Sequence, residues 1–124
     1  MRQVTSGELA AVFERLESGV RVVGSGNFAT PKALLNIADQ HISEFRLFML
    51  GAQGGIPDRD GVIYESPFLG PGMRRNVRLN YIPCRLSLVP VLLRTNFKPD
   101  LVLLHASSVR DGKVSLGVEV NVLP

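Results

Sequence analysis

The chain has 124 residues, of which 45% are hydrophobic and 20% charged, and this composition predicts a single globular domain with its own core. Its net charge of +3 allows an anionic ligand, but aromatic and basic residues are not interleaved as in RNA-binding proteins, so we expect no nucleic-acid partner. The lone cysteine, Cys84, excludes an internal disulfide and favours a reducing compartment. Because the sequence has neither a signal-peptide pattern nor an apolar run of about 18 residues, we expect a cytoplasmic protein without a membrane partner.

Helix and strand patterns alternate along the chain. A capping box formed by Thr5 and Glu8 predicts a first helix, which Ser18 and Gly19 end. Further helices are expected at residues 31 to about 41, 73–79 and 87 to about 95. Strands are expected at residues 20–23, 45–50, 62–64, 81–84, 101–105 and 114–122. The run at 101–105 is of the kind buried on both faces, whereas 114–122 alternates like a one-sided edge strand.

This alternation predicts an α/β fold, with a mainly parallel sheet flanked by helices, as one domain over residues 1–124. Ligands of such sheets bind beyond the carboxyl ends of the strands. The turn after residue 23 and residues 51–53 and 106–108 should meet at that edge.

The turn at residues 24–31 is the leading candidate for a site. Gly24 and Gly26 can adopt positive φ and admit a close neighbour, Thr30 is a good N-cap, and Pro31 suits the first helical position. Such a turn would aim unpaired N–H groups at one spot, which favours an anion or an oxyanion. The alternative is a tight connection that binds nothing.

Residues 24–29 also fit the G-x-G-x-x-A dinucleotide fingerprint. That interpretation needs an acidic residue at the end of the next strand, and the sequence has none there, since Glu44 precedes the strand. A dinucleotide-binding domain is therefore a weaker alternative. A Walker A loop is excluded, because no Gly-Lys-Ser/Thr follows.

The remaining reactive side chains form no complete catalytic set. His41 and His105 are isolated, so no metal site is expected, and Cys84 is expected to be a small buried apolar residue. No glutamate lies in a glycine-bounded turn that would present a nucleophile, so no catalytic residue is identified. The densest basic group, which is either a solvated surface or a phosphate contact, comprises Arg74, Arg75, Arg78 and Arg85.

Six stretches, in order and over nearly the whole chain, resemble the N-terminal region of the acetyl-CoA hydrolase/transferase family, which includes acetate and 4-hydroxybutyrate CoA-transferases. They are Val-Gly-Ser-Gly-Asn-Phe-Ala-Thr-Pro (23–31), Gly-Pro-Gly-Met-Arg (70–74), Asn-Tyr-Ile-Pro (80–83), Leu-Ser-Leu-Val-Pro (86–90), Asp-Leu-Val-Leu-Leu (100–104) and Asp-Gly-Lys-Val-Ser-Leu-Gly-Val (111–118). The last stretch is the most specific.

The resemblance implies a CoA-transferase-type α/β fold and transfer of CoA between an acyl-CoA and a small carboxylate through a glutamyl-CoA thioester. CoA would be a substrate, not a permanently bound cofactor. Residues 115–118 match a segment near the active-site cleft, so Ser115 and Gly117 are candidate CoA contacts, with Arg74, Arg75 and Arg78 as candidates for its phosphates. The loop that would line the site and hold the thioester oxyanion comprises Gly24, Ser25, Gly26, Asn27, Phe28 and Thr30.

Family members are several times longer, and no glutamate here matches their catalytic glutamate, which lies in the C-terminal half. We therefore expect an N-terminal half-module of a CoA-transferase or acyl-CoA hydrolase. The alternative is a non-catalytic module that binds CoA or nucleotide phosphates. We expect either a homo-oligomer, with residues 115–122 at its interface, or a second chain that carries the C-terminal half.

Overall fold

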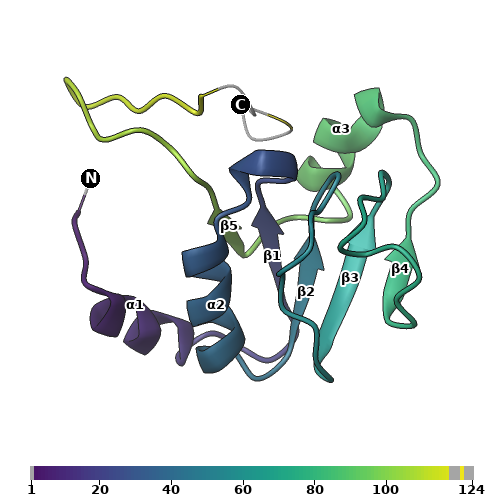
Figure 1. Ribbon diagram of the computed structural model, residues 1–124, viewed down its shortest axis with the longest axis horizontal. Coiled ribbons are helices and arrows are strands. Elements are labelled where there is room, and N and C mark those ends of the chain that lie inside the picture. Colours follow the sequence, from purple (N-terminus) through teal and green to yellow (C-terminus); the bar gives the residue numbers. More distant parts are fainter. Residues whose placement is uncertain (1, 118–120, 122–124) are drawn as a thin grey trace.

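The computed structural model describes residues 2–117 and residue 121. Five parallel strands form one sheet in the order β4-β3-β2-β1-β5 (Figure 1). This arrangement confirms the predicted α/β fold with a parallel sheet. The strands are β1 (Val20–Gly24), β2 (Phe45–Phe48), β3 (Val62–Ser66), β4 (Leu79–Tyr81) and β5 (Leu101–Leu103). The helices are α1 (Ser6–Phe13), α2 (Lys32–His41) and α3 (Val89–Arg94), with 3-10 turns η1 (Asn27–Ala29) and η2 (Leu86–Leu88).

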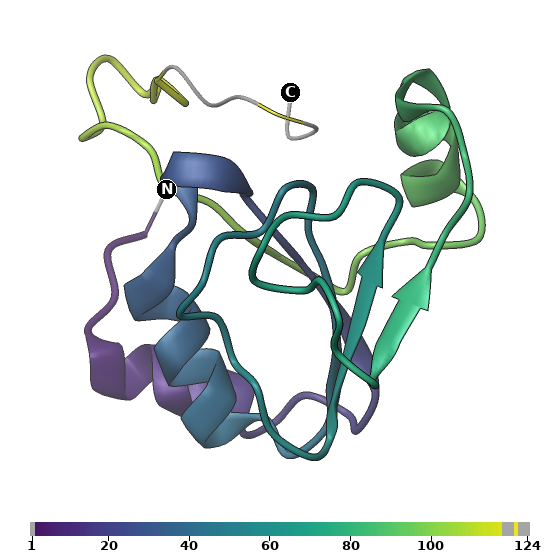
Figure 2. The same cartoon turned by 45° about the vertical axis from the view of Figure 1, so that its right-hand side comes forward.

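The chain covers the two faces of the sheet in two stages. From β1 to β4, each new strand pairs with the one before it, toward the same edge of the sheet. In this part of the chain, α2 and the loops after β2 and β3 lie on the first face, together with α1 (Figures 1 and 2). It then returns across the sheet to β5, and this connection carries α3 over the second face. Right-handed crossovers require this switch of face when the direction of travel reverses.

Successive side chains along each strand point to opposite faces of the sheet, and this alternation produces one hydrophobic core on each face. Val22, Leu47 and Tyr64 point to the first face, where they are fully buried in a core shared with α1, α2 and the loops after β2 and β3. Val23 and Phe48 point to the second face, where the connection containing α3 covers them. The sheet is thus apolar on both faces around β1 and β2, as its short β-branched and aromatic runs require.

The segment 73–79 is not the predicted helix but a series of turns. Gly70 and Gly72 pack so closely on the backbone of residues 51–53 that a Cβ would lie 2.3 Å from Ala52 O and 2.2 Å from Gln53 O. This contact fixes the loop, and Arg75 adopts a left-handed φ of 66°. Consequently β4 begins at Leu79 and ends at Tyr81, earlier than predicted.

The end of the chain also differs from expectation. β5 is an edge strand, not one buried on both faces, and Val102 is 45% exposed. Residues 114–117 are not a strand; they follow a turn closed by an antiparallel bridge between Arg110 and Lys113. The rest of the predicted strand, at 118–120 and 122, lies outside the described residues, and these positions are half of the predicted oligomer interface at 115–122.

Candidate functional site

The turn after β1 is tied to both neighbouring strands. The N–H of Ser25 donates to Leu103 O at 3.2 Å, and the N–H of Asn27 donates to Gly51 O at 3.2 Å. These two amides are therefore paired within the protein, contrary to the expectation of a set of unpaired donors. The turn does lie at the carboxyl edge of the sheet together with residues 51–53, as predicted.

Gly26 is the point of closest approach in this turn. Its φ of −93° and ψ of −167° are extended, and neither it nor Gly24 uses the positive φ that glycine can adopt. The left-handed residue is Asn27, with φ 48°. A Cβ on Gly26 would lie 1.6 Å from Leu50 O, so the group that needs this glycine is a backbone carbonyl of the protein itself.

Thr30 does not cap α2, as the sequence suggested. Its Oγ1 donates to Asn27 O at 2.7 Å and so closes η1, while Pro31 occupies the N-cap position without a side-chain hydrogen bond. Ser25 and Thr30 are both buried. Of the predicted substrate-loop residues, only Phe28 reaches the cavity described next.

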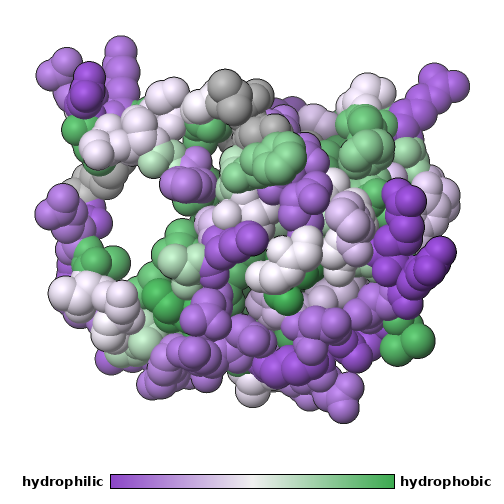
Figure 3. All heavy atoms as spheres, in the orientation of Figure 1, coloured by the Kyte–Doolittle hydropathy of each residue, from purple (hydrophilic) through white to green (hydrophobic). Residues whose placement is uncertain are grey.

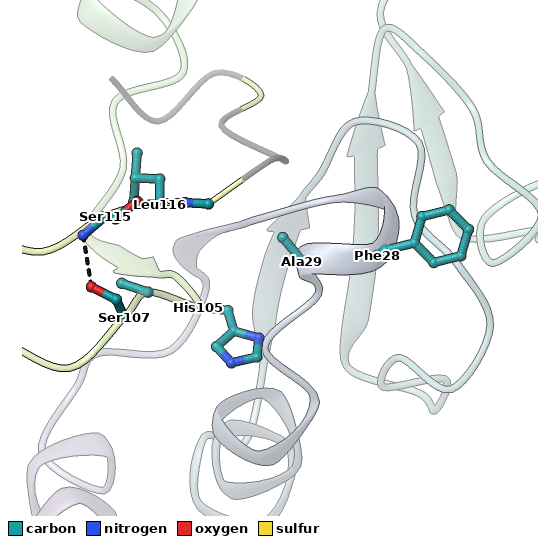
Figure 4. Close-up of a pocket in the computed structure, with 8 residues that line it drawn as sticks. Phe28, Ala29, His105, Ser107, Ser115 and Leu116 are labelled. Carbon is teal, nitrogen blue, oxygen red and sulfur yellow. Dashed lines mark hydrogen bonds between the residues drawn. The ribbon is translucent and has the colours of Figure 1, made fainter.

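A cavity of about 360 Å³ lies between η1 and the chain that follows β5 (Figure 4). Its lining residues are Phe28, Ala29, His105, Ala106, Ser107, Ser115, Leu116 and Gly117. The strands that follow β1 in the sequence, β2 to β4, are added at one of its edges, and β5 pairs with its other edge. The topological switch point therefore lies between β1 and β5. Crevices at such points are the usual ligand sites of parallel sheets.

Four hydrogen bonds organise one wall of this cavity. The N–H of Ser107 donates to Ser115 O at 2.8 Å, and the N–H of Ser115 donates to Ser107 Oγ at 2.9 Å. Ser107 Oγ donates to Ser108 O at 3.0 Å, and Ser115 Oγ accepts from the N–H of Gly117 at 3.1 Å. The Ser107 hydroxyl thus helps to hold the two segments together, whereas the Ser115 hydroxyl closes a turn within its own segment. No base that could activate either hydroxyl is hydrogen-bonded to it within the described residues.

The other wall is formed by η1. The ring of Phe28 points away from the serines and is 87% exposed, whereas Ala29 lies nearer to His105 (Figure 4). No carboxylate of the described residues lines the cavity. The cavity therefore offers an imidazole and backbone groups, but no acid that could form an acyl intermediate.

The predicted arginines lie elsewhere. Arg78 pairs with Asp58 and lies 3.6 Å from Asp60, and Arg74 donates to Leu69 O at 3.2 Å. Neither they nor Arg75 line the cavity. The three guanidinium groups do not converge on one anion, because the first two bind different parts of the protein.

The remaining candidates are also accounted for. His41 Nδ1 lies 2.8 Å from Glu14 Oε1 and links α2 to α1, and Cys84 is half-buried beside the second core. Sequence reasoning missed Glu65, which is 2% exposed and binds Arg21 through both carboxylate oxygens, at 2.6 and 3.2 Å. A charged residue within the apolar run of β3 was the available signal, but its partner strand could not be inferred.

Neither protein-family models nor curated protein sequences give a match to this chain. Within the described part of the chain, no helix has the length and apolar character needed to cross a bilayer.

Proposed function

We propose that this chain is the N-terminal half-module of a CoA-transferase or acyl-CoA hydrolase, which moves CoA between an acyl-CoA and a small carboxylate. One observation supports this proposal above all. The resemblance assigns the segments 24–31 and 115–118 to one cleft, and residues 28–29 of the first and 115–117 of the second line the same cavity. The two segments are far apart in the sequence, so the sequence motifs alone could not bring them together, and it is the fold that does so.

The nucleophile would come from a second polypeptide or from the C-terminal half that the resemblance implies. In the reaction, a glutamate carboxylate attacks the thioester carbonyl and CoA leaves as a thiolate, which gives a mixed anhydride. The thiolate then attacks the glutamyl carbonyl of the anhydride, the acyl group leaves as a carboxylate, and the glutamyl-CoA thioester results. Among the described glutamates, Glu65 is the buried one, but it is on the second face of the sheet and is held by Arg21. The role proposed for this chain is to bind and orient the acyl-CoA at the β1–β5 switch point.

The alternatives have less support. A dinucleotide pyrophosphate would have to approach the second glycine of the fingerprint, and that space beside Gly26 is filled by Leu50 O. A phosphate-binding module built on the arginines is disfavoured, because Arg78 is already bound by Asp58 and Asp60 flanks it.

The experiment is a titration of the chain with CoA and acetyl-CoA, followed by calorimetry and by amide NMR shifts. We expect shifts at residues 28–29, 105–107 and 115–117. Ala29→Leu, which enlarges a side chain in the cavity wall, should weaken binding at least about tenfold. Ala33→Leu, at an exposed position of α2, is the matched control and should bind normally.

Two outcomes contradict the proposal. Absence of binding at about 1 mM ligand, or equal binding by the Ala29→Leu variant, would remove the site from this cavity. If the purified chain alone exchanged CoA at about 1 s⁻¹ or faster, the nucleophile would have to lie within it.

A further inference from the structure

The segment 66–99 has an unusual charge distribution. It contains six of the 14 lysines and arginines and none of the 11 acidic residues. It forms β4, the loops on either side and α3, which lie together along one side of the molecule (Figures 1 and 2). Asp58, from outside the segment, pairs with Arg78, so the attraction of this segment for anionic groups comes from its other cations.

Within this segment, α3 is apolar on both of its faces. Val89 is fully buried and Leu93 packs against the second core, so these residues form the inner face. Leu88 and Val91, one turn apart on the outer face, are 47% and 51% exposed. A helix that is apolar all round is normally buried, so its outer face should be covered in the functional state.

Exposed cations flank this outer face. Arg85 precedes η2, and Arg94 follows Val91 by three residues, on the same side of α3. Neither guanidinium forms a hydrogen bond or an ion pair with any described residue. Figure 3 shows the hydrophobic atoms over α3 with hydrophilic atoms beside them. We name Arg85, Leu86, Leu88, Val91 and Arg94 the α3 patch.

We propose that the α3 patch docks an acidic, amphipathic segment of a partner protein, one that pairs aliphatic side chains with Leu88 and Val91 and carboxylates with Arg85 and Arg94. Arginine is enriched at protein–protein interfaces, and the buried centre of such an interface is apolar. The patch lies on the second face, away from the cavity at β1 and β5, so this inference is independent of the proposed function.

Other occupants fit the patch less well. A second copy related by a two-fold axis through the patch would place Arg85 and Arg94 against cations of its partner. An anionic membrane would have to be held by a helix of six residues, which is about 9 Å long, whereas many helices that bind in the membrane interface run to about 20–30 residues. An acidic protein segment satisfies both the charge and the apolar area.

The test uses a fluorescein-labelled peptide of about 16 residues, with leucines at helical spacing and glutamates elsewhere, titrated by anisotropy. Its control peptide carries lysines in place of the glutamates. We expect the acidic peptide to bind, and the Arg85→Glu/Arg94→Glu and Leu88→Ser/Val91→Ser variants each to weaken binding at least about tenfold. Arg15→Glu/Arg110→Glu makes the same charge change at exposed positions outside the segment and should have an effect below about threefold.

Several results would overturn the proposal. One is an absence of saturable binding up to about 1 mM peptide, and another is an equal loss in the Arg15→Glu/Arg110→Glu control, which would indicate only non-specific charge attraction. Binding of phosphatidylserine vesicles that Leu88→Ser/Val91→Ser abolishes, without peptide binding, would identify a lipid surface instead. Self-association by light scattering that the same variant abolishes would identify a second copy. Amide NMR spectra of every variant check that its fold is retained.

Discussion

Gly26 leaves no room for a side chain. Leu50 O occupies the space of its missing Cβ, at 1.6 Å, and also accepts a hydrogen bond from Asn121 Nδ2 at 3.3 Å. Gly26→Ala must therefore displace the chain after β2, and we expect a loss of about 3 kcal/mol or more in the free energy of unfolding, measured in urea. Gly7→Ala, in α1 with no atom within 4 Å of the new Cβ, should instead stabilise by about 0.5–1 kcal/mol. A stable Gly26→Ala variant would contradict this geometry.

Tyr64 makes stability sensitive to alkaline pH. Its side chain is fully buried, its hydroxyl donates to Pro57 O at 2.6 Å, and burial, reinforced by the charge of Asp58, raises its pKa from 10.0 to about 12. Between these pH values the unfolded chain has lost the phenol proton and the folded protein keeps it. Stability should therefore fall as the pH rises through this window, by about 1–3 kcal/mol in total.

The control for this prediction is Tyr64→Phe. It loses the hydrogen bond to Pro57 and should cost about 1 kcal/mol at pH 7. Its unfolding free energy should then vary less between pH 10 and pH 12 than that of the original chain. Parallel pH profiles for the two proteins would show that other groups cause the alkaline loss.

At the scale of the elements, Arg59 holds the end of α2. Its guanidinium donates to Asp39 Oδ1 at 2.7 Å and to the carbonyls of Asp39, Ile42 and Ser43 at 2.9, 2.6 and 2.8 Å. Lysine cannot reproduce this fork of donors, so Arg59→Lys and Arg59→Ala should both destabilise, by about 2–4 kcal/mol in urea. Arg15→Ala, at an exposed site, should change stability by less than about 0.5 kcal/mol. Full rescue by lysine would mean that charge alone matters.

Local signals explain which elements could be predicted from the sequence. The capping box formed: Glu8 Oε2 accepts from the N–H of Thr5 at 2.8 Å, and Thr5 Oγ1 accepts from the N–H of Glu8 at 3.2 Å. The helix predicted at 73–79 did not form, because Gly70 and Gly72 pack on a loop that is distant in sequence. Periodicity contains no information about such contacts.

In the candidate site, too, some features could be predicted from the sequence and others depend on contacts between distant segments. Residues 106–108 were predicted to meet the turn after β1, because parallel strands place their carboxyl ends at one edge. The need for glycine at position 26 could also be read from the sequence. That Leu50 O and not a ligand fills the adjacent space could not, because it depends on how the chain bends after β2.

At the scale of the whole molecule, the Arg21–Glu65 pair joins β1 to β3 across β2. It is bidentate, and the side chains are 12% and 2% exposed. Arg21→Met leaves a buried carboxylate unpaired and should cost about 3–5 kcal/mol, whereas Arg21→Met/Glu65→Leu should recover most of that loss. Urea unfolding of Arg21→Met, Glu65→Leu and the double variant gives the complete double-mutant cycle. Additive losses would mean that the two side chains do not interact.

The position of β5 beside β1 also has a consequence for the time course of folding. Asp100, just before β5, binds the N–H of Arg21 from 79 positions away, so β1 keeps one unpaired edge until almost the whole chain is available. At about 5–20 residues per second, a ribosome needs about 4–16 s to add that length. Closing so long a loop is slow, and the cavity at the switch point is therefore completed last. In a refolding experiment with pulsed hydrogen exchange, the Ser25 amide, which donates to Leu103 O, should be protected later than the amides that join β1 to β2.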